Sequence, residues 1–435
     1  MSIEETIVRE LRGLMGLMIS LMMLWACTSD EEVIEAPAPE HEMPIELSAS
    51  AVRYQEEEEP AANRRSWTPP SGYYLYSNLY EDNGSHYVNF ANVNLANKSI
   101  NVFFTRATDK EPTPVDPSDP KYSAYAFYPY HGRLRYMSTD DKWRLSINKV
   151  DPNVVPDGDY YVYGFIPSNA ADDATIEKLS GDYMNGATLT IKGLRTAGYD
   201  ACVIIGAREG FDIDHDGGYT DTNGNGSYDE GTDSRTNRLT AGDFKFNLKK
   251  GENVKNYLYL LFDHLCSAVS IGIKVDGDYN TLRTIKLKQL TLQTATESGL
   301  MAEKADVVVD LVANTMGINP ISGLSYGATD IGASVYQSDE GLTLTTSYQS
   351  FLSHFLPITD VTKVVITSTY DVYDKKNNLV RKDCKASNTI RLSDIISYFP
   401  GVQRGWKYGI SMTVKPTYLY VLSDPDLNNP TVVVE

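Results

Sequence analysis

The stretch Ile45–Val52, IELSASAV, contains the pattern that decides the fold of this chain. Every second residue from Ile45 to Ala51 is apolar, and the residues between them are glutamate or serine. Successive side chains of an extended chain point to opposite faces, so this alternation is typical of a strand with one buried face. We therefore expect a half-buried β-strand at the start of the folded region.

The same period of two recurs along the chain and predicts an all-β protein. Thirty tyrosines fit this reading, because tyrosine is favoured in strands of a pleated sheet that is partly exposed to solvent. The segment DKKNN at 374–378 is expected to be a hairpin turn. Helix signals are few: LSDIISYF at 392–399 could form two turns, and 174–179 is a weaker candidate. Further alternating segments lie at 99–104, 187–191, 284–288 and 410–414.

Many short strands separated by turns indicate antiparallel β-sandwiches rather than a parallel α/β sheet. A turn cluster, Asp276-Gly277-Asp278, suggests a boundary near residue 280. The expected domains are therefore residues 45–280 and 281–435. The formal net charge of −19 argues against a nucleic-acid partner, which would require a basic surface.

A lone cysteine, Cys27, ends an apolar run at 13–26 and precedes the acidic stretch SDEE. The run is too short to span a bilayer, but it has the length of a secretory signal core. Leu24–Cys27 resembles the lipobox of bacterial lipoproteins, although Trp25 departs from the small residue usual there. The resemblance implies a signal peptide at 1–26, lipid attachment at Cys27 and a membrane anchor; the alternative is a buried cysteine in an ordinary apolar helix.

Residues 27–44 are rich in Glu, Pro and Ala, and are expected to form a disordered tether. The stretch SDEE also resembles the export tag that directs lipoproteins of the Bacteroides group to the outer face of the outer membrane. This resemblance implies that the protein is displayed at the cell surface.

Several segments, taken in order, resemble the fimbrillins, the type V pilins of the Bacteroidales. The family implies two transthyretin-like β-sandwich domains in series, and a precursor that travels as a lipoprotein. An Arg-specific surface protease would then remove the first strand, and a strand from another fimbrial subunit would fill the vacated groove. The matching segments are YAFYPY at 125–130, GDYYVYGFIP at 158–167, LFDHLCSAVSI at 261–271, IRLSD at 390–394, FPG at 399–401 and KYGISMTV at 407–414.

The mechanism requires a loop after the first strand that a protease can cut. The segment YQEEEEPAANRRSWTPPSG at 54–72 is acidic and Pro-rich, and exposed loops of this kind are where proteases cut. We expect cleavage after Arg65, with Arg64 next and Arg53 third; a solvated basic pair is the alternative. The candidate donor strands are 418–422 and 431–434, for which a plain edge strand is the alternative.

The acidic segment at 212–233 is the strongest candidate for a metal site in the sequence. Calcium loops place oxygen ligands at alternate positions before a glycine, with an acid near position twelve. The match is imperfect, because the final acid falls one residue late, and a flexible acidic insertion is the alternative. A bound Ca²⁺ would stabilise the structure of this long loop and would have no catalytic role. The expected ligands are Asp221, Asn223, Asn225, Ser227, Asp229 and Asp233.

The sequence offers no convincing catalytic residues, so an enzyme is not expected. GLSYG at 323–327 matches G-x-S-x-G but lacks the strand before and helix after that the motif requires. Cys202, Cys266 and Cys384 allow either one bridge and a free thiol or three buried thiols. The alternative function is a monomeric surface lipoprotein that binds glycans through aromatic faces, for which Trp67, Trp143 and Trp406 are the available tryptophans.

Overall fold

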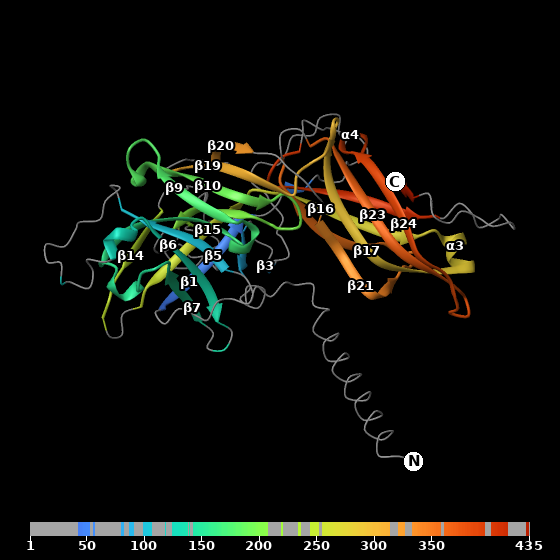
Figure 1. Ribbon diagram of the computed structural model, residues 1–435, viewed down its shortest axis with the longest axis horizontal. Coiled ribbons are helices and arrows are strands. Elements are labelled where there is room, and N and C mark those ends of the chain that lie inside the picture. Colours follow the sequence, from blue (N-terminus) through green and yellow to red (C-terminus); the bar gives the residue numbers. More distant parts are fainter. Residues whose placement is uncertain are drawn as a thin grey trace, which may run out of the picture. The chain divides into compact units, whose positions relative to one another are not determined.

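The computed structural model of this chain is built almost entirely from β-strands (Figure 1). All the residues that the structure describes belong to one compact unit. The residues that the structure describes are 42–52, 55–56, 80–81, 87–90, 99–106, 118, 124–137, 139, 142–207, 219–220, 234–235, 244–251, 255–313, 321–326, 333–357, 361–395, 402–415 and 432–434.

Seven strands of the largest sheet close into a ring. Their order is β15-β11-β8-β5-β6-β7-β1, and pairing between β1 and β15 completes the circle. Three further strands attach to it: β4 to β1, β3 (Tyr80–Glu81) to β4, and β14 to β8. The bounds are β1 (Met43–Val52), β4 (Tyr87–Phe90), β5 (Ser99–Thr105), β6 (Tyr130–Met137), β7 (Lys142–Ile147), β8 (Gly158–Ile166), β11 (Cys202–Ala207), β14 (Lys245–Leu248) and β15 (Tyr257–His264).

The ring contains one parallel seam, between β1 and β15. Strand directions alternate between antiparallel neighbours, and an odd number of strands cannot alternate all the way around a closed circle. Six of the seven neighbouring pairs are antiparallel, and β1 runs parallel to β15 from Glu46 opposite Tyr257 to Ala51 opposite Phe262. The first strand is therefore the member that makes closure with seven strands possible.

A separate four-stranded sheet has the order β20-β19-β10-β9. Tyr163 of β8 connects it with the ring, because its hydroxyl donates to the carbonyl of Tyr183 in the short helix η4 (Tyr183–Asn185), next to β10. Tyr163 is fully buried within one apolar core that includes residues of both sheets. The sheet's bounds are β9 (Asp173–Lys178), β10 (Gly186–Arg195), β19 (Lys304–Val312) and β20 (Ile321–Tyr326).

Two five-stranded sheets form the C-terminal part. One has the order β2-β25-β16-β22 with β26 on β25, and the other β18-β17-β23-β24 with β21 on β17. Their bounds are β2 (Gln55–Glu56), β16 (Ser267–Val275), β17 (Arg283–Thr296), β18 (Gly299–Leu300), β21 (Ala333–Thr343), β22 (Gln349–Phe355), β23 (Lys363–Asp374), β24 (Leu379–Arg391), β25 (Trp406–Val414) and β26 (Val432–Val434).

The all-β class predicted from the sequence is confirmed, and each alternating segment named above lies in a strand. The finer arrangement of two transthyretin-like sandwiches is not confirmed, because the N-terminal strands close into a ring. Strands that precede residue 280 also pair with strands that follow it: β10 pairs with β19, and β16 pairs with β22 and β25. The division into 45–280 and 281–435 stays a prediction.

Local predictions had mixed outcomes. The turn at 374–378 is confirmed: Asp374 accepts the backbone N–H groups of Lys376 and Asn378 at 2.8 Å each. The helix at 174–179 was wrong, because this segment pairs with β10 as strand β9. The helix expected at 392–399 begins at Leu392 as α4 (Leu392–Ile395), and residues 396–399 lie outside the described range. The turn expected at 276–278 is instead the start of α3 (Gly277–Leu282), with Asp276 as its N-cap. No helix in the described part of the chain has the length and apolar composition to cross a membrane.

We predict that Gly164→Ala destabilises the ring. Gly164 of β8 has φ +157°, and a Cβ there would lie deep inside van der Waals contact with the Asn101 carbonyl oxygen of β5. Forcing the two backbones apart is expected to lower the free energy of unfolding by about 1–3 kcal/mol. Gly409→Ala is the control, because a Cβ there meets nothing within 4 Å. Urea unfolding followed by tryptophan fluorescence measures both; equal midpoints would contradict the prediction.

Candidate functional site

Where the structure describes the side chains of β1, one face is buried, with Leu47 half-buried, and the other is exposed, as the sequence predicted. Met43, Ile45 and Ala49 are 5%, 3% and 8% exposed, whereas Pro44 and Glu46 are exposed. Ile45 lies opposite Trp143 of β7 in the ladder. The buried side chains of β1 are therefore part of the ring's core.

Both edges of β1 make backbone ladders. One edge pairs with β15 over six residues, 46–51. The other pairs with β7 over 43–45 and with β4 over 50–52. Removing β1 would consequently leave unpaired N–H and C=O groups on β15 and β7, beside the pockets that its apolar side chains had filled.

Polar contacts hold the beginning of β1. Glu42, just before the strand, forms an ion pair with Arg135 of β6, and both side chains are 12% exposed. At the other edge, the N–H of Glu46 donates to the carbonyl of Asn256 at 2.8 Å. The Asn256 side chain in turn binds the backbone of Lys249: Oδ1 accepts from the Lys249 N–H at 2.9 Å, and Nδ2 donates to the Lys249 carbonyl at 3.0 Å. This end of the strand is thus fixed from two sides.

Strands β2 and β26 share one edge of β25. β2 pairs with Trp406 and Lys407, and β26 pairs with residues 412–414. The opposite edge of β25 is taken by β16 over 407–414. The segment 43–56 therefore contacts two sheets: β1 lies beside β15 of the ring, and β2 lies beside β25.

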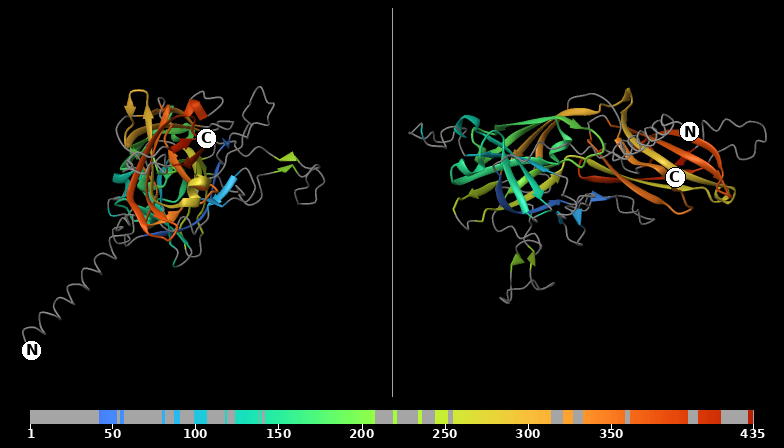
Figure 2. Two further views of the ribbon diagram at one scale, coloured as in Figure 1. Left: turned by 90° about the vertical axis from the view of Figure 1, so that its right-hand side faces the viewer. Right: turned by 60° about the horizontal axis from the view of Figure 1, so that its bottom comes forward.

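Most site residues predicted from the sequence fall outside the described residues. These are Cys27, Arg64, Arg65, the donor segment 418–422 and all six calcium ligands, Asp221, Asn223, Asn225, Ser227, Asp229 and Asp233. The residues on either side of the predicted calcium ligands are described: β12 (Tyr219–Thr220) pairs with β13 (Ser234–Arg235). This short ladder stands apart from the larger sheets in both views of Figure 2.

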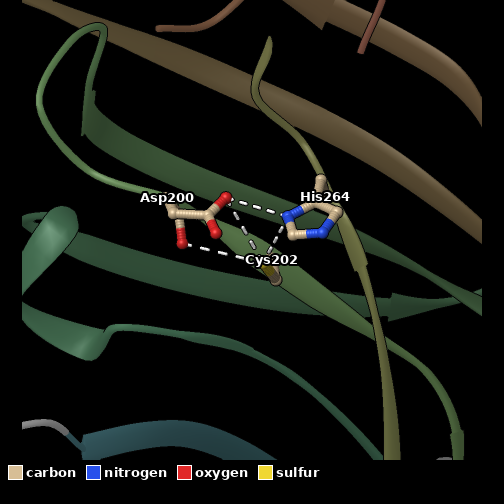
Figure 3. A group of neighbouring side chains, drawn as sticks. All are labelled: Asp200, Cys202 and His264. Atoms are coloured by element: carbon tan, nitrogen blue, oxygen red, sulfur yellow. Dashed lines mark hydrogen bonds and ion pairs between the residues drawn. The ribbon is translucent and has the colours of Figure 1, made fainter. Parts of the chain in front are cut away.

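A buried polar cluster that the sequence analysis missed lies where the ring meets the C-terminal sheets (Figure 3). It comprises Asp200, Cys202 and His264, which are 4%, 0% and 0% exposed. His264 Nδ1 lies 2.9 Å from Asp200 Oδ1 and 3.2 Å from Cys202 Sγ, and Sγ lies 3.7 Å from the same carboxylate oxygen. The three potential metal-ligand atoms thus converge on one point.

Neighbouring polar residues extend this cluster. His354 of β22 places its Nε2 3.9 Å from Asp200 Oδ2, and burial lowers the pKa of this imidazole. Asp263 is fully buried and accepts from Arg404 Nη1 at 2.7 Å and from the His264 N–H at 2.8 Å. Cys266 Sγ donates to the Tyr199 carbonyl at 3.3 Å, and burial raises the pKa of that thiol.

The cluster does not have the geometry of nucleophilic catalysis. In a catalytic triad, the nucleophile and the carboxylate contact different nitrogens of the imidazole. Here Cys202 and Asp200 both contact Nδ1 of His264. The G-x-S-x-G segment also lacks its required setting, because Gly323–Tyr326 lies inside strand β20 rather than at a strand-to-helix turn.

The three remaining cysteines are free and buried, which matches the second of the two sequence alternatives. Sequence signals for the cluster were weak. Asp200 and Cys202 are two residues apart, and His264 follows more than sixty residues later, so no standard ligand spacing appears.

Comparisons with known proteins found no matching family model and no matching curated protein. Solved structures do match. A candidate cell adhesion protein of Bacteroides fragilis aligns with 12% identity and TM-score 0.34, covering 90% of this chain and 96% of that chain. A fimbrial protein of Bacteroides vulgatus aligns with 13% identity and TM-score 0.28, covering 78% and 91%.

The fimbrial anchor protein Mfa2 of Porphyromonas gingivalis aligns with 11% identity and TM-score 0.24, covering 90% of this chain and 95% of that chain. Each alignment extends over most of both proteins. These three solved structures are described as a cell adhesion protein, a fimbrial protein and a fimbrial anchor of the Bacteroidales.

Proposed function

We propose that this chain is a fimbrial subunit that is exported as a lipoprotein to the cell surface. An Arg-specific protease cuts it at Arg64–Arg65, and the cut subunit polymerises with other fimbrial subunits by strand exchange. The observation that carries the proposal is the position of β1, which closes the ring at its one parallel seam and contributes Met43 and Ile45 to the core.

A cut after Arg65 would release β1 and β2 together, because both precede it in the chain. Two strand positions, here called tracks, would then be vacated: one beside β15 and β7, and one beside residues 406–407 of β25. Each large apolar side chain withdrawn from the core exposes surface whose burial is worth about 1.5–3 kcal/mol. A strand from another subunit can restore the ladder and fill the pockets, which is the β-augmentation mode of binding.

The glycan-binding alternative loses one of its aromatic platforms. Trp143 is 5% exposed, packs against Tyr136 with ring centroids 5.7 Å apart, and lies opposite Ile45 of β1 in the ladder. A tryptophan needs an open face to stack on a sugar. Trp406 is half-buried, and Trp67 lies outside the described residues. The fimbrial proposal is therefore preferred.

The processing step predicts that Arg64→Ala/Arg65→Ala blocks maturation. N-terminal sequencing and mass spectrometry of protein from the cell surface should show wild type starting at Ser66 and the double variant keeping β1. The variant should also lose the heat-resistant ladders expected of a strand-exchanged polymer on a gel. Arg53→Ala is the control and should mature normally. A wild-type chain that still begins at Cys27 on intact cells would refute the processing step.

If the track beside β15 and β7 is vacated, we predict that a peptide of residues 43–52 rebinds to the cut protein. An Ile45→Asp/Ala49→Asp peptide should fail, because it would place carboxylates in two buried positions. A Glu46→Ala peptide is the matched control and should bind within severalfold of the native peptide, because Glu46 is exposed. Fluorescence anisotropy measures all three affinities. Equal affinities for the native and the aspartate peptides would show that the apolar pockets do not select the strand.

The C-terminal segment is the proposed donor. β26 pairs with residues 412–414 of β25 within the same chain, on the edge that β2 also uses. Deleting residues 423–435 should abolish incorporation into polymers and leave a folded monomer. Gel ladders report incorporation, and circular dichroism with urea unfolding reports folding. Polymerisation of the truncated chain at the wild-type level would rule this segment out as the donor.

A further inference from the structure

We propose that Asp200, Cys202 and His264 bind a Zn²⁺ ion where the ring meets the C-terminal sheets. This site is separate from the acidic segment at 212–233. It is also independent of fibre formation, since it rests on the geometry of the buried cluster alone.

The ligand atoms already have nearly the spacing that such an ion requires. Zinc bonds to nitrogen and oxygen at about 2.0–2.2 Å and to sulfur at about 2.3 Å, which places neighbouring ligands of a tetrahedron about 3.3–3.6 Å apart. The three separations in the cluster are 2.9, 3.2 and 3.7 Å. Shifts of a few tenths of an ångström would open the triangle around an ion.

The backbone fixes the positions of these side chains. Cys202 of β11 lies directly opposite His264 of β15 in the ladder. The N–H of Leu265 donates to the carbonyl of Ala201 at 2.8 Å, so the chain on either side of both ligands is held. On the other side, the N–H of Gly198 donates to the carbonyl of His354 at 2.7 Å, which ties β22 to the loop that carries Asp200.

Charge balance favours a divalent ion in this setting. The three side chains are at most 4% exposed, so water cannot solvate a net charge among them. A thiolate and a carboxylate together neutralise a divalent cation, and a neutral imidazole completes the set. The mixture of sulfur, nitrogen and one oxygen suits Zn²⁺, whereas Ca²⁺ and Mg²⁺ prefer ligand sets made of oxygen.

Metal-dependent refolding tests the site. The full-length chain is unfolded in denaturant with a chelator and refolded with Zn²⁺, with Co²⁺ or without metal. Unbound ions are then removed and the retained metal is measured. We expect one tightly held Zn²⁺ per chain and a higher urea midpoint with Zn²⁺ than without. The Co²⁺ form should show a thiolate-to-cobalt charge-transfer band, which cobalt bound only to oxygen ligands in the acidic segment would lack.

Two variants locate the metal. Cys202→Ser should lose the charge-transfer band and the retained metal. Cys384→Ser is the matched control and should keep both, because Cys384 is an equally buried free cysteine on β24, opposite Tyr370.

Three results would overturn the proposal. The first is wild type that refolds to its native circular dichroism spectrum and retains no metal. The second is a charge-transfer band that survives in Cys202→Ser. The third is a band lost equally in Cys384→Ser. The wild-type measurement decides even where a variant fails to fold, since it requires no substitution.

Discussion

The architecture depends on a parity constraint. Seven strands cannot alternate direction around a closed circle, so at least one neighbouring pair must run parallel, and here that pair is β1 and β15. Closure therefore depends on the first strand of the folded region, which supplies Met43, Ile45 and Ala49 to the core and is paired along both edges. Because β1 is joined to the rest of the chain only through the segment that follows it, breaking that connection would leave only non-covalent contacts to keep the ring closed.

Local sequence predicted the strands but not their closure. Period-two alternation reports which residues face a core, so the segments at 45–49, 99–104 and 187–191 were identified as strands. The β1–β15 ladder joins residues more than two hundred positions apart, and no local pattern encodes such a partner. Segment 174–179 shows the converse: a weak helical pattern yields to pairing with β10, because the backbone ladder outweighs intrinsic propensity.

The candidate site residues divide in the same way. Contiguous signals, such as Arg64–Arg65 and the acidic segment at 221–233, are visible in sequence and lie outside the described residues. Asp200, Cys202, His264 and His354 come from three separate parts of the chain and meet only after the strands have paired. His264 and His354 are both buried, and each has Asp200 as a polar neighbour. What the sequence could not indicate is that they share one carboxylate.

Strands β15 and β16 form one nearly continuous run from Tyr257 to Val275, broken only at residues 265–266. The run pairs with β11 and β1 on the ring side, and with β22 and β25 on the C-terminal side. Tension applied between the two halves would act along this run. Its ladder hydrogen bonds would then be loaded together in shear rather than opened one after another, so the backbone that joins the sheets would also oppose mechanical extension of the protein.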